Sequence, residues 1–181
     1  LHRVLRLMEE EDLYANLKKC SSGLKSVVYL GHIISENGVA MDPEKLAAIK
    51  TWREPKTTKE VRGFLGLTGY YRKYNKDYGK IARPLTTLTK KDNFKWSCEA
   101  QEAFDKLKGT LTTASVLAMP DFSQTFTIER DASGMGIDAV LMQGGKLLAY
   151  YSKALFDDNL AKSIYEKELM ALVLSIQHWR L

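Results

Sequence analysis

The chain has 181 residues, of which 45% are hydrophobic, so it can form one larger packed domain or two to three small ones. Its 27 Lys and Arg against 22 Asp and Glu give a net charge of +5. The sequence contains no run of about 18 apolar residues, so no membrane-spanning helix is predicted. Cys20 and Cys98 lack metal-type spacing, which favours free thiols in a reducing compartment, so we expect an intracellular location, cytoplasmic, nuclear or both.

The first elements in chain order are a helix and a hairpin. Apolar residues at helical spacing predict a helix over residues 1–16. This start has no apolar block before a small-residue cleavage site, so no secretory signal is predicted, and the missing initial methionine indicates a piece of something longer. β-Branched and aromatic residues over 26–34, a turn signal over 35–38 and a short return at 39–40 predict a hairpin.

Two helix starts follow the hairpin. An Asp-Pro-Glu sequence at 42–44 predicts a helix with Asp42 as its N-cap, and this helix is expected to end near Trp52. The spacing from Thr57 to Glu60 is that of a capping box, which opens a second helix.

The remaining elements change from helices to strands. A short helix is expected around 84–88, and Ser97 caps another helix that Gly109 is expected to end. Strands are predicted over 125–131, 137–143 and 147–152, with turns between them at 133–136 and 144–145. A last helix over 164–181 is predicted to face inward through Leu169, Leu172, Val173 and Ile176.

The helix that starts at Thr57 has an unusual composition. Gly63, Gly66 and Gly69 each cost about 1 kcal/mol against alanine in a helix, which indicates that something approaches this backbone closely. Small residues, aromatic rings and cations on one helix suit a nucleic-acid backbone or minor groove. Helix–helix packing through a glycine face, with the tyrosines in a core, is the alternative. The candidate nucleic-acid-binding residues are Gly66, Gly69, Tyr70, Arg72, Lys73 and Lys76.

Charge is concentrated in the same part of the chain. Residues 50–91 contain 12 Lys and Arg against 3 Asp and Glu, a net charge of +9, while both flanking segments are mildly acidic. A solvated helical surface also carries many lysines. The size of the local excess favours phosphate binding.

Seven short motifs identify a family. They are YLGHIIS (29–35), DPEKLAAIKTW (42–52), FLGLTGYYRKY (64–74), PLTTLTKK (84–91), AFDKLK (103–108), DASGMGIDAVLMQ (131–143) and YEKELMALV (165–173). In this order and spacing, the sequence resembles the reverse transcriptase region of gypsy-type LTR retrotransposons over essentially its whole length. The resemblance implies an α+β fold, and a parent activity of RNA-directed DNA synthesis and RNA cleavage in RNA–DNA hybrids.

The resemblance also divides the chain into four parts. Residues 1–41 are expected to be the palm end with a primer-grip-like hairpin, and 42–91 a thumb-like helical region whose helix lies in the minor groove of the primer–template duplex. A connector with one helix is expected over 92–123, and the first half of an RNase H-like domain, three antiparallel strands plus a helix, over 124–181. The primer-grip-like residues are Tyr29, Leu30, Gly31 and His32.

Catalysis in this family depends on carboxylates that hold magnesium. The Tyr-x-Asp-Asp turn of the polymerase site is absent from this sequence. RNase H chemistry needs four carboxylates around two metal ions about 4 Å apart. By motif, Asp131 matches the first and Glu168 the second, and the third and fourth would lie after residue 181. The resemblance therefore implies a chain that is inactive alone and holds no magnesium stably.

Two residues depart from the family pattern beside these carboxylates. Asp138 stands where the family usually has glycine, and we expect its side chain to face water rather than to repel the other carboxylates. Arg130 stands where the family often has threonine. Because side chains alternate along a strand, Arg130 is expected to point away from the Asp131 face and to matter little.

Two functions of different classes remain open. The first is a non-catalytic fragment that binds nucleic-acid duplexes, RNA–DNA hybrid or DNA, with the glycine–tyrosine face and the cations exposed in one groove. The second is a host-adopted module that keeps the fold for protein interaction, with that face covered. In either case the predicted strand edge at 125–130 lacks a partner strand, so we expect self-association. No membrane partner is expected.

Overall fold

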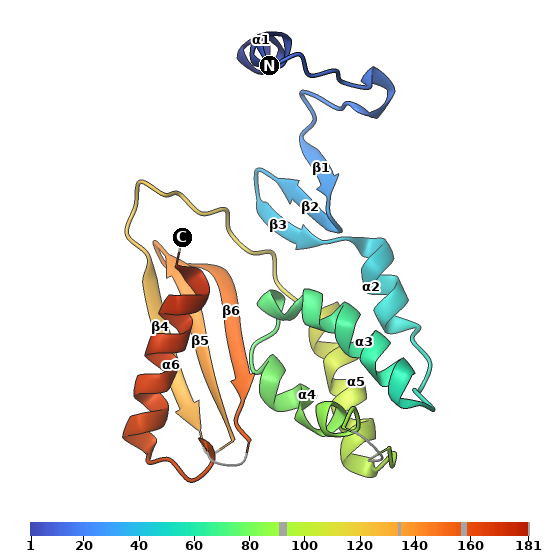
Figure 1. Cartoon of the computed structure of the whole chain (residues 1–181), viewed down its shortest axis with the longest axis vertical. Helices are drawn as coiled ribbons and strands as arrows, with labels where there is room; N and C mark the ends of the chain where they lie inside the picture. Colours follow the sequence, from blue (N-terminus) through green and yellow to red (C-terminus); the bar gives the residue numbers. More distant parts are fainter. Residues whose placement is uncertain (91–93, 134, 157–158, 181) are drawn as a thin grey trace.

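The computed structural model describes residues 1–90, 94–133, 135–156 and 159–180. The described helices are α1 (His2–Glu10), α2 (Pro43–Lys50), α3 (Thr58–Tyr70), α4 (Tyr78–Thr87), α5 (Cys98–Thr112) and α6 (Ile164–Trp179), with 3₁₀ turns η1 (Leu17–Lys19) and η2 (Arg72–Tyr74). The strands are β1 (Ser26–Tyr29), β2 (His32–Ser35), β3 (Gly38–Met41), β4 (Thr127–Ser133), β5 (Gly136–Gln143) and β6 (Lys146–Ala154). Figure 1 shows the sheet β1-β2-β3 next to helices α2–α5, and the sheet β4-β5-β6 beside those helices with α6 on it. The expected α+β class is confirmed.

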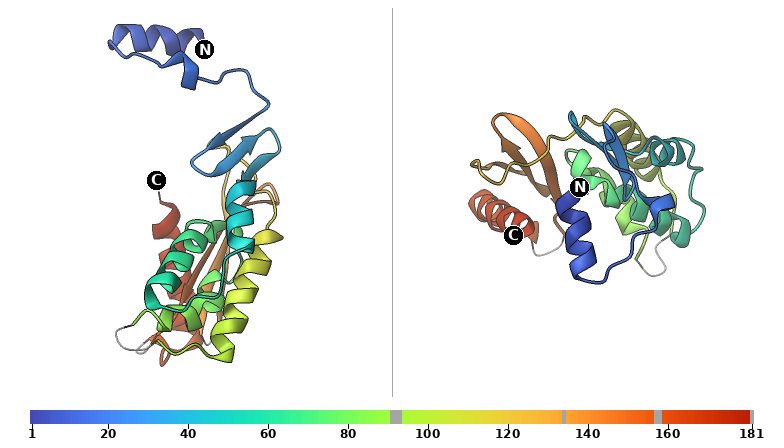
Figure 2. Two further views of the ribbon diagram at one scale, coloured as in Figure 1. Left: turned by 90° about the vertical axis from the view of Figure 1, so that its right-hand side faces the viewer. Right: turned by 90° about the horizontal axis from the view of Figure 1, so that it is seen from above.

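Helix α1 stands apart from the other elements. None of its side chains is buried, and Figure 2 shows it projecting from one end of the molecule. It ends at Glu10, earlier than the helix predicted over 1–16. Without a packing surface, only local propensity holds the segment in a helix, which makes its end hard to predict.

The segment 26–34 is two strands rather than one. Strands β1 and β2 pair antiparallel up to Tyr29 opposite His32. Leu30 and Gly31 form the turn between them with φ of 48° and 74°, the left-handed conformation that two-residue hairpin turns require. The prediction of one strand was wrong because leucine rarely adopts a positive φ and gives no turn signal. The return strand β3 pairs with β2 as expected.

The predicted N-caps form. A side-chain oxygen of Asp42 accepts a hydrogen bond from the Glu44 amide at 2.9 Å, and Thr57 accepts one from the Glu60 amide at 3.2 Å. Ser97 caps α5 in the same way. These bonds satisfy amides that the first helical turn leaves without partners.

Two helices are longer than predicted. Helix α4 begins at Tyr78 and contains Pro84 in its interior. Proline removes one backbone hydrogen bond from the helix, and the burial of Ala82 and Leu85 compensates for this loss. Helix α5 continues through Gly109 because Leu111, in the next turn, is fully buried in the core.

The helices share one hydrophobic core with the first sheet and the connector. Phe64 of α3 and Phe104 of α5 meet at its centre, with ring centroids 4.6 Å apart. Met41 of β3 and Leu117 of the connector belong to the same cluster, so it crosses two of the boundaries drawn from the sequence. The division into four parts stays a prediction. No helix in the described ranges is long and apolar enough to cross a membrane.

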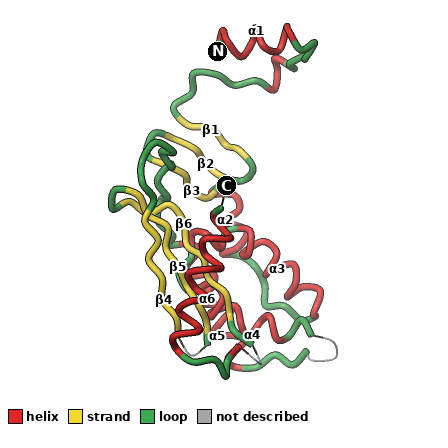
Figure 3. The backbone as a smooth tube through the Cα atoms, turned by 60° about the vertical axis from the view of Figure 1, so that its left-hand side comes forward, coloured by secondary structure: helices red, strands yellow, loops and turns green. Residues whose placement is uncertain are grey.

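The second sheet has the predicted strand order and the predicted turn at 144–145, while Gly134 of the other predicted turn lies outside the described residues. Strands β4, β5 and β6 form an antiparallel meander, and Gly144 and Gly145 turn between β5 and β6 with positive φ. Helix α6 covers one face of the sheet (Figure 3). On the other face, the amide of Gly79 at the start of α4 donates a hydrogen bond to the Ser152 hydroxyl at 2.8 Å.

Helix α6 presents a different side to the sheet than predicted. Its buried residues are Lys167, Ala171 and Ser175, while Leu169 is 61% exposed. Val173 and Ile176 are also exposed, and Leu172 is half-buried. The predicted inward face was therefore wrong. Apolar residues occur around the whole circumference of α6, so their spacing does not select one side, and small residues allow the helix to approach the sheet closely.

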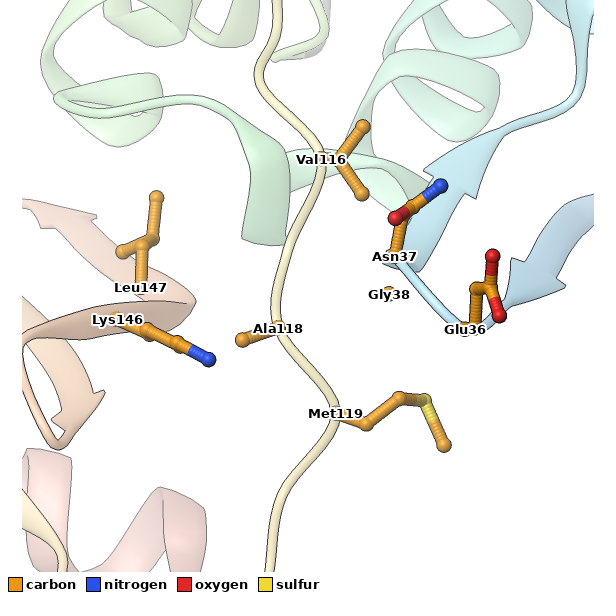
Figure 4. A pocket seen from close by; sticks show the side chains of 8 residues that line it. All are labelled: Glu36, Asn37, Gly38, Val116, Ala118, Met119, Lys146 and Leu147. Carbon is orange, nitrogen blue, oxygen red and sulfur yellow. The ribbon is translucent and has the colours of Figure 1, made fainter.

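The connector joins the two sheets. Val39 of β3 and Leu117 exchange both backbone hydrogen bonds, and the amide of Ala118 donates to the Leu147 carbonyl at 2.7 Å. Figure 4 shows this segment running between β6 and the β2–β3 turn. A Cβ on Gly38 would lie 2.1 Å from the Leu117 carbonyl oxygen, so only glycine fits there.

Candidate nucleic-acid interface

The small residues of α3 lie on an open side of the helix. Val61 and Phe64 are buried towards the core, while Arg62, Gly66 and Tyr70, spaced by four residues, are exposed on the opposite side. A Cβ built on Gly66 meets no atom within 4 Å. Packing among the described residues therefore does not require glycine at this position.

The other two glycines of the stripe make ordinary contacts. A Cβ on Gly69 would lie 3.4 Å from the Tyr78 hydroxyl, and one on Gly63 would lie 3.7 Å from the Trp52 ring. Both contacts are with side-chain atoms, so no neighbouring backbone in the described chain presses on the stripe. The packing alternative is not observed at Gly66.

The β1–β2 turn lies against the end of α3. The Tyr70 hydroxyl donates a hydrogen bond to the Leu30 carbonyl at 2.7 Å, and the Tyr71 hydroxyl donates to the Gly31 carbonyl at 2.9 Å. The His32 ring stacks on Tyr70 with centroids 5.4 Å apart. The structure thus brings the primer-grip-like residues and the glycine–tyrosine helix into one surface.

Burial shifts the pKa values of Tyr74 and His32 towards their uncharged forms. Burial, followed by repulsion from Tyr71 and Tyr70, raises the pKa of Tyr74 to about 12. Burial, and then the positive charge of Lys73, lower the pKa of His32. Tyr74 Oη lies 3.0 Å from His32 Nδ1. Hydrogen bonds between neutral side chains can hold this surface rigid without adding charge to it.

The expected cations lie beyond the helix. Helix α3 ends at Tyr70, and Arg72 and Lys73 belong to the turn η2, with Lys76 in the loop before α4. The prediction of one continuous helix was wrong: the 3₁₀ turn η2 follows Tyr71, and Asp77 then adopts a left-handed conformation before α4 begins. The six predicted nucleic-acid-binding residues therefore fall into two groups.

The second group faces the C-terminal sheet. Arg72 is close enough to His178 to contribute, after burial, to lowering its pKa. Lys73 is half-buried, with Nζ 5.4 Å from the centre of the Tyr74 ring, and burial lowers its pKa. Lys76 lines a pocket of about 140 Å³ together with Glu129 and Asp131. A duplex on the α3 face meets these cations only if its path continues towards the second sheet.

Asp138 is buried and ion-paired. It lies directly opposite Asp131 in the β4–β5 register, it is 6% exposed, and its carboxylate contacts the ammonium of Lys80 from α4. The expectation that Asp138 faces water was wrong, because α4 packs on this side of the sheet. Burial raises the pKa of Asp138, and Lys80 partly offsets this effect.

Glu168 also has a cationic partner. Its Oε2 lies 3.2 Å from a guanidinium nitrogen of Arg130. Arg130 pairs opposite Ala139 while Asp131 pairs opposite Asp138, and alternation places the two side chains on different faces of the sheet. The expected direction of Arg130 agrees with this register. Arg130 contacts a candidate metal ligand, and the expectation that it matters little stays a prediction.

Comparisons with known proteins match this architecture. A family model described as an RNase H-like domain found in reverse transcriptase matches residues 96–181. The retrovirus-related Pol polyprotein from transposon 297 of Drosophila melanogaster is 39% identical over 181 residues, which cover 98% of this chain and 17% of that protein. An uncharacterised mitochondrial protein of Arabidopsis thaliana, AtMg00860, is 55% identical over 128 residues, 70% of this chain and 81% of that protein.

The chain is thus similar to a part of retrotransposon polyproteins and, over residues 96–181, to the RNase H-like domain found in reverse transcriptase.

Solved reverse transcriptases share its fold. The foamy viral protease–reverse transcriptase in complex with RNA/DNA hybrid superimposes with a TM-score of 0.87 at 24% identity, over 97% of this chain and 25% of that chain. The same viral protein in a complex with double-stranded DNA gives a TM-score of 0.86 at 24% identity, over 97% of this chain and 32% of that chain. At this identity the likeness shows the fold alone.

The magnesium chemistry of the reverse transcriptase family does not fit the described side chains. Among the described residues, no group of three or more His, Cys, Asp and Glu side chains could hold a metal ion. By register, Asp131 points to the face of the sheet opposite the one that α6 covers, and Glu168 of α6 is held by Arg130. Two-metal catalysis requires carboxylates that converge on one point.

Sequence reasoning missed two cations on the open side of α3. Lys59 and Arg62 are exposed there, and an Arg62 guanidinium nitrogen donates to the Thr89 carbonyl at 2.8 Å. The signal was available, because Arg62 precedes Gly66 by four residues and therefore shares its side of the helix.

Proposed function

We propose that this chain binds nucleic-acid duplexes, RNA–DNA hybrid or double-stranded DNA, along the outer side of α3 and the β1–β2 turn. The observation that carries the proposal is the contact between Tyr70 and Leu30, which joins the turn to the open glycine side of α3. The similar foamy viral structures were solved with an RNA/DNA hybrid and with double-stranded DNA. We assign the four predicted parts of the chain, in order, to the palm end, thumb, connector and first RNase H half of a gypsy-type reverse transcriptase.

Each part of the surface has a role in this proposal. The absence of a side chain at Gly66 lets a sugar–phosphate backbone approach α3. The exposed rings of Tyr29 and Tyr70 offer apolar faces for sugars or bases. Lys59 and Arg62 supply charge beside the glycine, in the way that lysine and arginine neutralise phosphates and release counterions.

The second candidate is a host-adopted module for protein interaction. It predicts that the glycine–tyrosine side is covered, whereas Gly66 faces open space and Tyr70 is 52% exposed. These observations favour the duplex. A protein partner that masks Gly66 and competes with duplex would support the second candidate instead.

We also propose that the chain alone performs neither DNA synthesis nor RNA cleavage. The contact between Glu168 and Arg130 supports this, as does the lack of a metal-holding group among the described side chains. An RNase H assay on a labelled hybrid with magnesium should show no cleavage. Magnesium-dependent cleavage that disappears in Asp131→Asn would overturn the proposal.

Salt-dependent binding tests the function itself. Fluorescence anisotropy with a labelled hybrid and a labelled DNA duplex should give micromolar or weaker affinity near physiological salt, and the affinity should rise steeply at lower salt. Lys59→Gln with Arg62→Gln should weaken binding and flatten the salt slope, whereas Lys106→Gln, an exposed lysine of α5, should not. Absence of binding to either duplex at low salt would reject the function.

The same assay locates the duplex path. The triple change Arg72→Gln, Lys73→Gln and Lys76→Gln should flatten the salt slope if the duplex continues from α3 towards the second sheet. An unchanged slope confines the duplex to α3 and the β1–β2 turn.

A further inference from the structure

The contact between Arg130 and Glu168 has a defined place in the fold. Arg130 lies on β4 opposite Ala139, and Ala139 lies opposite Tyr151 of β6. The Tyr151 ring packs on His178 near the end of α6, with centroids 4.7 Å apart. Arg130 therefore belongs to the face of the sheet that α6 covers, and its guanidinium meets Glu168 of that helix.

The two carboxylates that match RNase H ligands, Glu168 and Asp131, point in different directions and have different charged neighbours. Glu168 is paired with Arg130. Asp131 points to the other face, where its direct neighbour Asp138 is paired with Lys80. No salt bridge is described for Asp131, which lines a pocket with Lys76. Glu168 and Asp138 thus each have a cation of the same chain as a partner.

We infer that Arg130 replaces a divalent ion as the partner of Glu168, so that α6 docks on the sheet without metal and Glu168 is unavailable as a metal ligand. A guanidinium 3.2 Å from the carboxylate supplies one positive charge, which balances the single negative charge of Glu168. It also repels a divalent cation that approaches the same oxygens. This inference concerns the sheet and α6, and it is independent of duplex binding by α3.

Two measurements on the whole chain test the inference. The first is a Mn²⁺ titration, followed by electron paramagnetic resonance of the free ion. The wild-type chain and Glu168→Gln should behave alike, with no binding that depends on Glu168 at millimolar Mn²⁺. Stoichiometric Mn²⁺ binding by the wild-type chain that Glu168→Gln removes would overturn the inference. This measurement needs no change at Arg130.

The second measurement is a thermal-melting cycle without metal. Arg130→Thr and Glu168→Gln should each lower the Tm, and the double change should lower it by less than the sum. The coupling should be about 1–3 °C, the range for a part-exposed ion pair in a chain of this size. Lys153→Thr, on the same face of β6, is the control and should show no coupling to Glu168→Gln. Strictly additive changes for Arg130 and Glu168 would overturn the inference.

Discussion

The hydroxyl of Tyr70 donates a hydrogen bond to the backbone carbonyl of Leu30, 40 residues earlier in the chain. The bond attaches the β1–β2 turn to the last residue of α3, and His32 stacks on the same ring. Two segments that the sequence singles out separately therefore form one exposed surface. The tyrosines at the end of α3 contact this turn through two hydrogen bonds, from Tyr70 and from Tyr71.

Tyr70→Phe should loosen this attachment. The change removes the hydrogen bond to Leu30 and keeps the ring that stacks on His32. The free energy of unfolding should therefore fall by about 0.5–1.5 kcal/mol. Amide hydrogen exchange at Gly31 and His32 should become faster. Tyr29→Phe is the matched control, because the structure describes no hydrogen bond of the Tyr29 hydroxyl. Equal exchange in both variants would show that the Tyr70 hydroxyl does not hold the turn.

Gly66→Leu separates duplex binding from stability. Helix propensity improves and the site is open, so the Tm should stay equal or rise, while a leucine side chain should block a duplex backbone and weaken binding severalfold. Gly109→Leu on α5 is an equally open control and should leave binding unchanged. A lower Tm for Gly66→Leu would show instead that another surface packs on this stripe.

Lys80→Met should be among the most destabilising single changes. The change leaves the buried Asp138 carboxylate without a counter-ion. It should lower the free energy of unfolding, measured by urea denaturation at neutral pH, by about 3–5 kcal/mol. Adding Asp138→Asn should restore most of the loss. Because burial raises the pKa of Asp138, the Lys80→Met chain should regain stability as the pH falls and the carboxyl takes up a proton. Lys153→Met, on an exposed lysine of β6, is the control.

His32 should make the folded state less stable in mild acid. Burial and Lys73 lower its pKa from 6.5, so the unfolded chain takes up a proton more readily than the folded chain. The stabilisation is present above pH 6.5 and is lost as the pH falls through the folded-state pKa. His32→Gln should reduce the pH dependence of unfolding between pH 7.5 and about 5, whereas His2→Gln, on exposed α1, should not. Identical profiles for both variants would exclude this role. His178 shifts in the same direction, so some dependence should remain.

Local signals predicted the elements that depend on local chemistry. Asp42, Thr57 and Ser97 cap the helices they were expected to cap, because an N-cap needs only its own turn. The Gly144-Gly145 turn follows from backbone freedom alone. The α+β class and the strand order of the second sheet follow from such signals and from the family resemblance.

Tertiary contacts decided what the sequence could not predict. Asp138 is buried only because α4 approaches the sheet, where a Cβ on Gly79 would lie 2.7 Å from the Ala154 nitrogen. The inward side of α6 depends on Ala171 and Ser175 fitting the sheet, while larger apolar residues remain outside. The partner of Glu168 is 38 residues away in sequence. None of these contacts leaves a periodic pattern in the sequence.

The edge of β4 leads to the last prediction, self-association. In the described chain β4 pairs only with β5, and the connector forms its backbone hydrogen bonds with β3 and with Leu147 of β6. An apolar pocket of about 400 Å³ lies between β4, β5 and the end of α6, and its lining includes Phe122, Phe126 and Ile128. Unpaired strand edges next to apolar surface recruit other chains. We therefore expect a twofold dimer that pairs β4 strands or exchanges α6.

Light scattering at roughly 100 µM tests this expectation. A dimer with a micromolar dissociation constant, which corresponds to ~8 kcal/mol of binding free energy, is well populated at this concentration. The wild-type chain should scatter above the mass of a 20.5 kDa monomer. Thr127→Lys places a charge on the β4 edge and should shift the chain to the monomer if strands pair there. Leu169→Lys should do so if the exposed side of α6 is the contact. Thr112→Lys, an exposed position on α5, is the control. A clean monomer for the wild-type chain at this concentration would refute the dimer, and with it the argument that the β4 edge needs a partner.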